Sequence, residues 1–321
     1  LYNILPGAAN QWVVKLPGET FSQGQTSLGS AIGGSPSAQQ SAEAFDVEVY
    51  LTDAEFNVVD NDSQTISLST SDTADSDPSS TTLTDGTATI SVTNVTVGSG
   101  HSITPSGGSY SANASSSYVV SAGTPVAIIA RLPGQTHNQP AVNLGAAITG
   151  AETVDNVDND FSVELIAVDA NFNKVSTYTS AASSVTVSTP NDSKDTEPSS
   201  GQFVNGSVTF TISPVVAGAT NVVNVSNTLS LANNNSSNYG VDPGASTHLL
   251  VELPGESFNP GNTSISGVIT GSASAQVAGT SFTADVHLVD AEFNLVDDDT
   301  STVSLSSNDA NDTDPVDVTL S

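Results

Sequence analysis

The sequence predicts an all-β fold in which antiparallel β-sandwich domains follow one another in tandem, head to tail. Two phrases of the sequence, one near residue 16 and one near residue 53, each occur three times, at spacings of 116 and then 121 residues. A repeat of that length is a whole domain, because solenoid repeats run to about 20–50 residues. Apolar and polar residues alternate with period 2 along several stretches, and no stretch keeps the 3.6-residue period of a helix.

The repeated phrases divide the chain into copies of one domain. The first is Leu16-Pro17-Gly18, which returns as Leu132-Pro133-Gly134 and as Leu253-Pro254-Gly255; the second is Asp53-Ala54-Glu55-Phe56-Asn57, with counterparts at residues 169–173 and 290–294. We expect copy 1 at residues 6–122, copy 2 at residues 123–242 and copy 3 at residues 243–321, truncated.

The two ends of the chain read as incomplete copies. Tyr2 aligns with Tyr118 and Tyr239, which fall near the ends of copies 1 and 2, so residues 1–5 are expected to be the last strand of a preceding copy. Copy 3 stops about 40–45 residues before the other two do. We therefore expect the natural polypeptide to continue in both directions.

Alternating stretches predict the strands. They lie at residues 45–51, 65–69 and 87–92 in copy 1, at 161–168, 184–188 and 207–212 in copy 2, and at 282–289 in copy 3. Asp85-Gly86 and Asn205-Gly206 stand just before a strand, where hairpin turns favour them. About seven short strands in roughly 116 residues indicate an antiparallel sandwich.

Recurring aromatic residues mark the expected core. Phe45, Phe161 and Phe282 share one position of the repeat, and a second position is occupied by Phe56, Phe172 and Phe293. Aromatic residues that recur on the period-2 face are most simply core residues, with ligand stacking as the alternative. Trp12, the one tryptophan, aligns with Ile128 and Leu249 and is expected in the core or at a junction.

Composition excludes several function classes. The formal net charge is −30, with 34 acidic residues against four lysines and arginines. Nucleic acid binding needs clustered Lys or Arg, and an acidic membrane surface would repel the chain. No apolar run is long enough to span a bilayer. The chain has no Cys, which excludes thiol catalysis and disulfides, and its wealth of Ser, Thr, Asn and Gly suits an extracellular, cell-surface protein.

The order of these features resembles a known family. A strand, the Asp53–Asn57 phrase, a second alternating strand, an acidic loop, Asp85-Gly86 and another strand follow one another as in bacterial immunoglobulin-like repeats of invasin and intimin type, and in giant surface adhesins. The resemblance covers essentially the whole chain. It differs at one position, where the family usually carries Gly before the equivalent Asn and this chain has Phe56. The resemblance implies a non-enzymatic extracellular stalk or fibre.

No catalytic constellation is present. The four histidines, His101, His137, His248 and His287, fall at non-equivalent positions of the repeat. The chain lacks the nucleophile elbow, the phosphate-binding glycine loop and the zinc-protease helix motif. We therefore expect no catalytic residues and no enzyme activity.

The strongest chemical signal is an acidic loop that recurs in each copy and predicts calcium binding. Three carboxylates within six residues, followed by a proline, can surround one Ca²⁺ with help from carbonyls and water. The alternative is a solvated turn in which Asp and Asn bond their own backbone. The candidate ligands are Asp72, Asp75 and Asp77, then Asp192, Asp195 and Glu197, then Asp309, Asp312 and Asp314.

A second acidic cluster follows the strand at residues 45–51 and supplies second-choice ligands. Its members are Asp53, Glu55 and Asn57, then Asp169 and Asn173, then Asp290, Glu292 and Asn294. In an immunoglobulin-like sandwich this loop and the first acidic loop lie at opposite poles. In a head-to-tail array the acidic loop of one copy therefore approaches the second cluster of the next, and a cation could bridge them. Junctions around Gly7, Gly123 and Gly244 leave little linker, which favours contact.

Three functions remain open on this basis. The favoured one is a structural or adhesive segment of an extracellular fibre, because each copy buries its own core and length grows by duplication. Its partners would be neighbouring repeats or other copies of itself. The alternatives are an array of modules that bind surface glycans, other cells or a partner in a secreted or S-layer-like protein, and an accessory part of a secreted hydrolase. A glycan binder needs exposed aromatic residues, which separates it from the first function.

Overall fold

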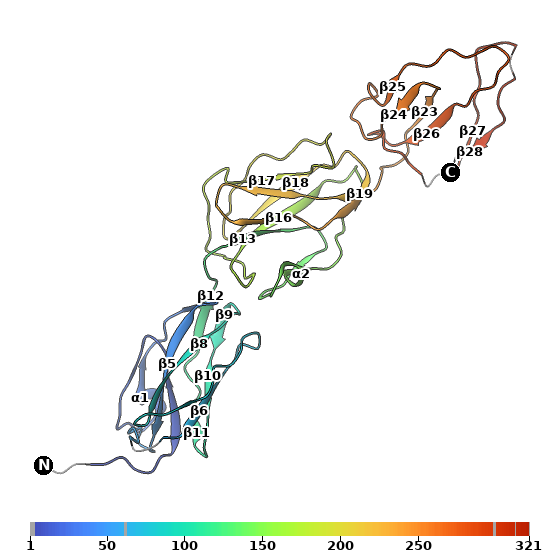
Figure 1. The fold of residues 1–321 in the computed structure, drawn as a ribbon. Coiled ribbons are helices and arrows are strands. Elements are labelled where there is room, and N and C mark those ends of the chain that lie inside the picture. Colours follow the sequence, from blue (N-terminus) through green and yellow to red (C-terminus); the bar gives the residue numbers. More distant parts are fainter. Residues whose placement is uncertain (1–3, 61–62, 298–299, 312, 321) are drawn as a thin grey trace. The chain divides into compact units, whose positions relative to one another are not determined.

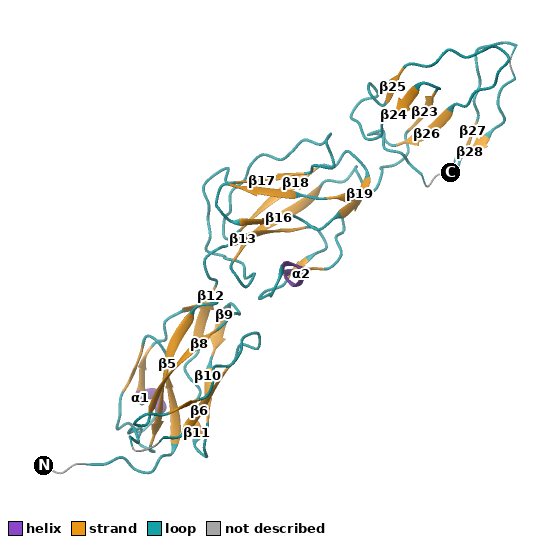
Figure 2. Ribbon diagram, viewed as in Figure 1, coloured by secondary structure: helices purple, strands orange, loops and turns teal. Residues whose placement is uncertain are grey.

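The computed structural model describes residues 4–60, 63–297, 300–311 and 313–320, and over these residues the fold is all-β, as predicted (Figure 2). Helix is limited there to two single turns, α1 (Leu28–Ala31) and α2 (Leu144–Ala147). No periodicity predicts them, because four residues are too few to show one. Asn143 caps α2 by accepting a hydrogen bond from the backbone N–H of Ala146.

The chain divides into two compact units (Figure 1). Unit 1 comprises Leu1–Ala127, Thr136–Thr149 and Ala167–Tyr178, and unit 2 comprises Ile128–Gln135, Gly150–Ile166 and Thr179–Ser321. Unit 1 thus holds copy 1 with part of copy 2, and unit 2 holds the rest of copy 2 with copy 3. Among the described residues, no sheet joins strands of different copies. No helix in the described ranges is long and apolar enough to cross a membrane.

Copy 1 has its strands in several small sheets. The strands are β1 (Gln11–Lys15), β2 (Glu19–Phe21), β3 (Ile32–Gly34), β4 (Gln39–Gln40), β5 (Ala44–Thr52), β6 (Thr65–Thr70), β7 (Thr81–Thr82), β8 (Thr87–Thr93), β9 (Gly98–His101), β10 (Ile103–Ser106), β11 (Ser111–Ala112) and β12 (Tyr118–Ser121). The largest sheet has the order β11-β1-β5-β8, with further sheets β10-β6-β7, β4-β12-β9 and β2-β3. The three strands predicted for this copy are thereby confirmed.

The core of copy 1 is formed by residues from these sheets. Leu51 of β5 and Ile66 of β6 are fully buried in it, and so is Trp12. Phe45 packs edge-on against Tyr118 with ring centroids 5.7 Å apart. Each such buried apolar side chain contributes about 1.5–3 kcal/mol, so the period-2 pattern is the main source of stability.

Copy 2 repeats this arrangement. Its strands are β13 (Ala127–Arg131), β14 (Thr136–His137), β15 (Ile148–Thr149), β16 (Phe161–Val168), β17 (Val185–Ser188), β18 (Ser207–Ile212), β19 (Gly218–Asn221), β20 (Asn224–Asn227), β21 (Ala232–Asn234) and β22 (Tyr239–Val241). The sheet orders are β18-β16-β13-β21, β17-β20, β19-β22 and β14-β15. Phe161 meets Tyr239 edge-on at 5.2 Å, as Phe45 meets Tyr118 in copy 1.

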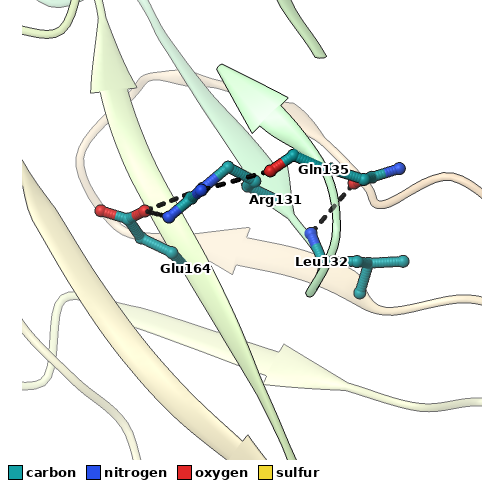
Figure 3. Close-up of polar contacts among 4 residues, drawn as sticks. All are labelled: Arg131, Leu132, Gln135 and Glu164. Carbon is teal, nitrogen blue, oxygen red and sulfur yellow. Dashed lines mark hydrogen bonds and ion pairs between the residues drawn. The ribbon is translucent and has the colours of Figure 1, made fainter. Parts of the chain in front are cut away.

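A cross-strand ion pair joins the two central strands of the main sheet in copies 1 and 2. Lys15 of β1 pairs with Glu48 of β5 at 2.8 Å. In copy 2, the guanidinium of Arg131 binds Glu164 at 2.5 Å and also donates to the carbonyl of Gln135 (Figure 3). The two pairs use two of the four basic residues and neutralise only two of the 34 acidic residues.

Copy 3 differs from the prediction. Its strands are β23 (His248–Glu252), β24 (Glu256–Phe258), β25 (Ile269–Gly271), β26 (Asp285–Val289), β27 (Thr302–Val303) and β28 (Val318–Thr319). The strand predicted to begin at Phe282 begins at Asp285, and Phe282 and Leu249 are each 52% exposed instead of buried. The physical reason is local, since Phe45 and Phe161 lie within β5 and β16 and pack on Tyr118 and Tyr239, whereas Phe282 lies outside β26.

Copy 3 contains a cavity. The cavity has a volume of about 320 Å³ and is lined by Val286 and Leu288 of β26 together with Val303 and Leu305. Their counterparts in copy 1, Val49, Leu51, Ile66 and Leu68, belong to the buried core. A small cluster of Leu250, Val268, Val289 and Phe293 remains as the core of this copy.

The predicted hairpin turns are confirmed. Asp85 and Gly86 adopt φ of 49° and 73°, and Asn205 and Gly206 adopt 52° and 79°. Both pairs take the left-handed region twice in succession, as a two-residue type I′ hairpin requires. A Cβ on Gly86 would stand 2.4 Å from the carbonyl oxygen of Val59, so glycine is required there.

Candidate functional site: the turn and the acidic loop at the junctions between copies

An Asp–Asn turn recurs at the second phrase of the repeat. In copy 1, Asp53 Oδ1 accepts hydrogen bonds from the backbone N–H groups of Glu55 and Asn57 at 3.0 and 2.9 Å, and Asn57 Nδ2 donates to both Asp53 oxygens. Copies 2 and 3 repeat every one of these bonds at residues 169–173 and 290–294. An Asp that bonds the backbone two residues on forms an Asx turn. The second-choice metal ligands therefore shape a turn.

The turn sets the backbone conformation at the position where the resemblance predicts Gly and this chain has Phe. Phe56, Phe172 and Phe293 have φ of 58°, 58° and 60°. This left-handed conformation is easiest for glycine and strained for a bulky residue. Phe56 and Phe293 are only 5% and 7% exposed, so burial of the ring offsets the strain.

Each turn is tied to the glycine at the start of its own copy. Gly7 N–H donates to Asp53 Oδ2 at 2.8 Å, Gly123 to Asp169 at 3.0 Å and Gly244 to Asp290 at 2.8 Å. Burial alone would raise the pKa of Asp53, but the bonds from Asn57, Gly7 and Glu55 outweigh it and lower that pKa below its ordinary value. The carboxylate is thus held ionised.

In copy 2 the turn also contacts copy 1, and both ends of each bond lie in unit 1. Asn173 Nδ2 donates to the carbonyl oxygen of Val95 at 2.9 Å and to Ser41 Oγ at 3.0 Å. Asn171 Nδ2 donates to the same hydroxyl at 3.1 Å, and that hydroxyl donates to Val95 at 2.9 Å. Asn173 is fully buried and Ser41 is 3% exposed. We call this set of contacts the joint.

Copy 3 makes the equivalent joint with copy 2, entirely within unit 2. Asn294 Nδ2 donates to the carbonyl of Val215 at 2.9 Å, and Asn294 Oδ1 accepts from the backbone N–H of Ala217 at 2.8 Å. Asn294 is 1% exposed, whereas Asn57 in copy 1 is partly exposed. The difference follows from the contact, because Asn57 bonds within its own turn.

The first acidic loop holds the segment that receives this amide. Asp72 Oδ2 accepts from the backbone N–H groups of Val95 and Thr96 at 2.9 and 2.7 Å, and its Oδ1 accepts from Ala74 N–H at 3.0 Å and the Thr96 hydroxyl at 2.5 Å. Burial would raise the pKa of Asp72, but the bonds from Thr96, Val95 and Ala74 lower it overall. Asp192 binds the N–H groups of Val215 and Val216 in the same way.

The other acidic residues of the loop hold the loop itself. Asp75 accepts from the hydroxyl of Thr70 and from Asn94 Nδ2, while Asp77 accepts from the backbone N–H of Thr70. Burial raises the pKa of Asp75, opposed by Thr70 and Asn94 and reinforced by the charges of Asp72 and Asp77.

Copies 2 and 3 keep this loop in part. Asp195 accepts from the hydroxyl of Thr189 and Glu197 from its backbone N–H. Burial raises the pKa of Asp195, opposed by Thr189 and reinforced by Glu197 and Asp192. In copy 3, Asp314 accepts from Ser307 N–H and Asp309 from Asn311 N–H, and Asp312 lies outside the described residues.

The calcium prediction stays a prediction at these loops. Among the described residues, no three Asp, Glu or His side chains are arranged to hold a metal ion. A site here would need carbonyl and water ligands beside the carboxylates, a donor set that calcium accepts. The two predicted acidic sets of neighbouring copies lie near each other. The contact between the copies is a hydrogen bond from an Asn amide of one copy to a backbone carbonyl of the other.

The second joint carries more negative charge than the first. Burial raises the pKa of Glu292, and the charges of Asp290 and Asp158 raise it further. Glu292 Oε2 is buried with no hydrogen-bond partner among the described residues. Asn171 occupies the equivalent position in the first joint and donates to Ser41 instead.

Sequence reasoning missed the receiving side of the joint. Val95 and Val215 act through a backbone carbonyl that any residue supplies. Ser41 acts through its hydroxyl, which carries no distinctive signal in a chain rich in serine. The recurring Asn after Phe was visible, and its buried amide is what identifies the joint.

No protein-family model matches the chain, and no curated protein matches its sequence. Solved structures of bacterial adhesins are similar to it. The Escherichia coli adhesin FdeC matches at 16% identity over 94% of this chain and 80% of that chain, with a TM-score of 0.39. The Yersinia pseudotuberculosis adhesin InvE matches at 12% identity over 70% and 65%, with a TM-score of 0.28. The D0-D1 domain of intimin matches at 12% identity over 64% and 94%, with a TM-score of 0.24. The predicted resemblance to invasin- and intimin-type domains is thus found among solved structures.

Proposed function

We propose that the chain is a non-enzymatic structural segment of an extracellular surface fibre, stalk or adhesin built from repeated immunoglobulin-like sandwiches. The observation that carries the proposal is the joint. A buried asparagine of one copy donates to a backbone carbonyl of the copy before it, at 2.9 Å in both instances. Copies that are hydrogen-bonded to their neighbours can transmit force and keep a fixed spacing, which independent modules on flexible linkers cannot do.

The geometry of the turn supports this role. Asp53 and Asn57 have the bonds of the turn in copy 1, where the hydrogen bonds of Asn57 to described residues all go to Asp53. A surface that is organised before contact loses little conformational entropy on contact. The same turn can therefore serve at each junction, and length can be added by duplicating a copy.

Composition supports a location at the cell surface. A net charge of −30 keeps an exposed chain soluble and resists non-specific association. The glycan-binding alternative needs a cluster of exposed aromatic residues. In the described ranges Phe282 is the one aromatic residue with a largely exposed side chain, so this alternative gains no support.

Cross-linking tests the joint directly, because the chain has no native Cys. Ala42 and Ala170 are exposed and stand next to Ser41 and Asn171, so thiols at these positions flank the joint without removing its contacts. We expect the double variant Ala42→Cys, Ala170→Cys to be cross-linked rapidly by a short bifunctional maleimide. Replacing Asn173 by Ala should slow the reaction about tenfold, because it removes the buried amide.

Two controls keep the test sharp. Ala54 is the counterpart of Ala170 within copy 1, and strand β5 (Ala44–Thr52) separates it from Ala42 by roughly 30 Å at about 3.3 Å per residue. The pair Ala42→Cys, Ala54→Cys should not cross-link. Asn57→Ala changes the same residue type in the turn of copy 1 and should leave the Ala42–Ala170 rate unchanged. Equal rates for the Asn173 and Asn57 variants would refute the joint.

Location needs its own experiment. Antibodies against the purified chain should label filaments or projections outside intact source cells in electron micrographs. Labelling confined to the cell interior would overturn the extracellular assignment, even where the joint is intact.

A further inference from the structure

We infer that the acidic loop of each copy builds the docking surface on which the next copy seats, with Asp72 and Asp192 as its positioning residues. The inference rests on the proposed function, since it concerns how one sandwich receives another. The partner that fits this surface is a further sandwich that presents an Asp–Asn turn.

A single peptide group links the loop to the joint in copy 1. Its carbonyl oxygen, on Val95, accepts from Asn173 at 2.9 Å, and its N–H, on Thr96, donates to Asp72 at 2.7 Å. A hydrogen bond from the N–H to a carboxylate polarises the peptide group, so its carbonyl becomes a better acceptor. The carboxylate also fixes the direction in which the carbonyl points.

Further bonds immobilise the same segment. Val95 N–H and the Thr96 hydroxyl also donate to Asp72, at 2.9 and 2.5 Å. Asn94, the residue before them, is fully buried and donates to Asp75. Three consecutive residues are thus held by two carboxylates of the loop.

Copy 2 supplies an independent second instance in the other unit. Asp192 accepts from Val215 N–H at 2.6 Å and from Val216 N–H at 3.0 Å, and the carbonyl of Val215 accepts from Asn294 at 2.9 Å. Pro214 replaces Asn94, so copy 2 lacks the equivalent of the Asn94–Asp75 bond, while the bonds to the first Asp of the loop remain. The feature that both joints share is the carboxylate on the receiving peptide.

Burial shows that this carboxylate is part of the packed end of copies 1 and 2. Asp72 and Asp192 are each 5% exposed. A buried carboxylate is costly unless it is hydrogen-bonded, and here backbone N–H groups of the receiving segment are donors to it. The acidic residue and the segment therefore stabilise each other.

The test adds one substitution to the Ala42→Cys, Ala170→Cys chain and compares it with a matched substitution in the same loop. Asp72→Asn weakens the hold on the receiving peptide. Asp77→Asn is the control, because Asp77 accepts a hydrogen bond from Thr70 and, among the described residues, has none with residues 94–96. Unfolding of copy 1 is followed in the same samples through the fluorescence of Trp12.

We expect Asp72→Asn to slow cross-linking about tenfold under conditions where copy 1 is still folded, as loss of a charge-assisted hydrogen bond implies. Asp77→Asn should lower the unfolding midpoint without slowing cross-linking. Equal slowing by both variants, or by neither, overturns the inference while the proposed joint stands. A parent chain that does not cross-link overturns the joint, and this inference with it.

Discussion

The carboxylate of Asp53 accepts a hydrogen bond from the backbone N–H of Gly7 at 2.8 Å, across 46 residues of sequence. The same bond joins Asp169 to Gly123 and Asp290 to Gly244, each again across 46 residues. One side chain therefore shapes a turn and fixes the start of its copy. In copies 2 and 3 it also orients the asparagine that reaches the preceding copy.

Replacing Asp53 by Asn should destabilise copy 1 by about 1–3 kcal/mol, because an amide cannot accept all of these bonds and presents N–H donors to N–H donors. Trp12 is the only tryptophan and is fully buried in copy 1, so its fluorescence during urea unfolding reports this copy. Asp46→Asn, at an exposed position of β5, is the control and should leave the midpoint unchanged. A midpoint for Asp53→Asn that matches this control would contradict the role assigned to the carboxylate.

Tyr118→Phe should destabilise copy 1 by about 1–2 kcal/mol, while Tyr239→Phe should have a smaller effect on copy 2. The Tyr118 hydroxyl donates to the buried Oδ1 of Asn94 at 2.7 Å. Burial raises the pKa of Tyr118 to about 12, so the phenol keeps its proton. Pro214 stands in the position of Asn94 in copy 2, and the Tyr239 hydroxyl has no hydrogen bond to any described residue.

Hydrogen exchange read by mass spectrometry at β12 and β22 measures both variants in the same way. Faster exchange is expected at β12 in Tyr118→Phe. An equal increase at β22 in Tyr239→Phe would show that loss of the hydroxyl destabilises these strands without the bond to Asn94.

The regular parts of the fold were predictable because each depends on neighbours in sequence. Alternation at residues 45–51 predicts β5, and Asp85-Gly86 predicts a turn whose backbone only small or flexible residues adopt easily. Prediction failed at Phe282, because burial at this position depends on a contact distant in sequence, such as Phe45 makes with Tyr118, and the alternation of residues 282–289 does not show that contact.

The positions of the acidic residues were predictable, but the hydrogen bonds that they accept were not. The recurring carboxylates at Asp53 and Asp72 were found, and both lie at junctions. Their partners are backbone N–H groups of Gly7, Val95 and Thr96, which are distant in sequence and have no side-chain signature. Composition alone therefore could not distinguish carboxylates that bind backbone from carboxylates that bind a cation.

Replacing Glu19 by Gln should stabilise copy 1 by about 1 kcal/mol. Glu19 is 5% exposed, and while its Oε2 accepts from Leu16 N–H, its Oε1 has no partner among the described residues. Copy 2 carries Gln135 at this position, whose Nε2 donates to Ser237 at 2.8 Å. An amide removes a buried charge and can make that bond. The reverse change, Gln135→Glu, should destabilise copy 2, and a lower Trp12 midpoint in Glu19→Gln would contradict the argument.

Glu48→Gln should alter the acid stability of copy 1. The ammonium of Lys15 and then the hydroxyl of Tyr50 lower the pKa of Glu48. A lowered pKa contributes stability that is present above about pH 4.3, the ordinary value for glutamate, and is lost as the pH falls through the folded-state pKa. The side chain is 43% exposed, so the contribution is only a few tenths of a kcal/mol.

Trp12 unfolding measured from pH 7 to pH 3 checks this sign. The native chain should lose slightly more stability than Glu48→Gln over that range. Glu164→Gln removes the equivalent ion pair in copy 2 and should leave the Trp12 profile as it is. Identical profiles for the native chain and Glu48→Gln would show that the pair contributes nothing.

Calcium should raise the melting temperature of the chain, and a chelator should reverse the effect. Burial together with the charges of Asp72 and Asp77 raises the pKa of Asp75. Burial and the charges of Glu197 and Asp192 raise the pKa of Asp195 in the same way. Each loop therefore holds crowded carboxylates whose mutual repulsion a bound cation would offset. At millimolar Ca²⁺, a site with a dissociation constant of about 10⁻⁴ M adds about 1.4 kcal/mol by mass action.

The double variant Asp75→Asn, Asp195→Asn should lose this response, and Asp46→Asn should keep it. Titration calorimetry counts the sites. An unchanged melting temperature with no heat of binding would mean that hydrogen bonds from Thr70, Asn94 and Thr189 are sufficient, and the loops would then be structural without an ion.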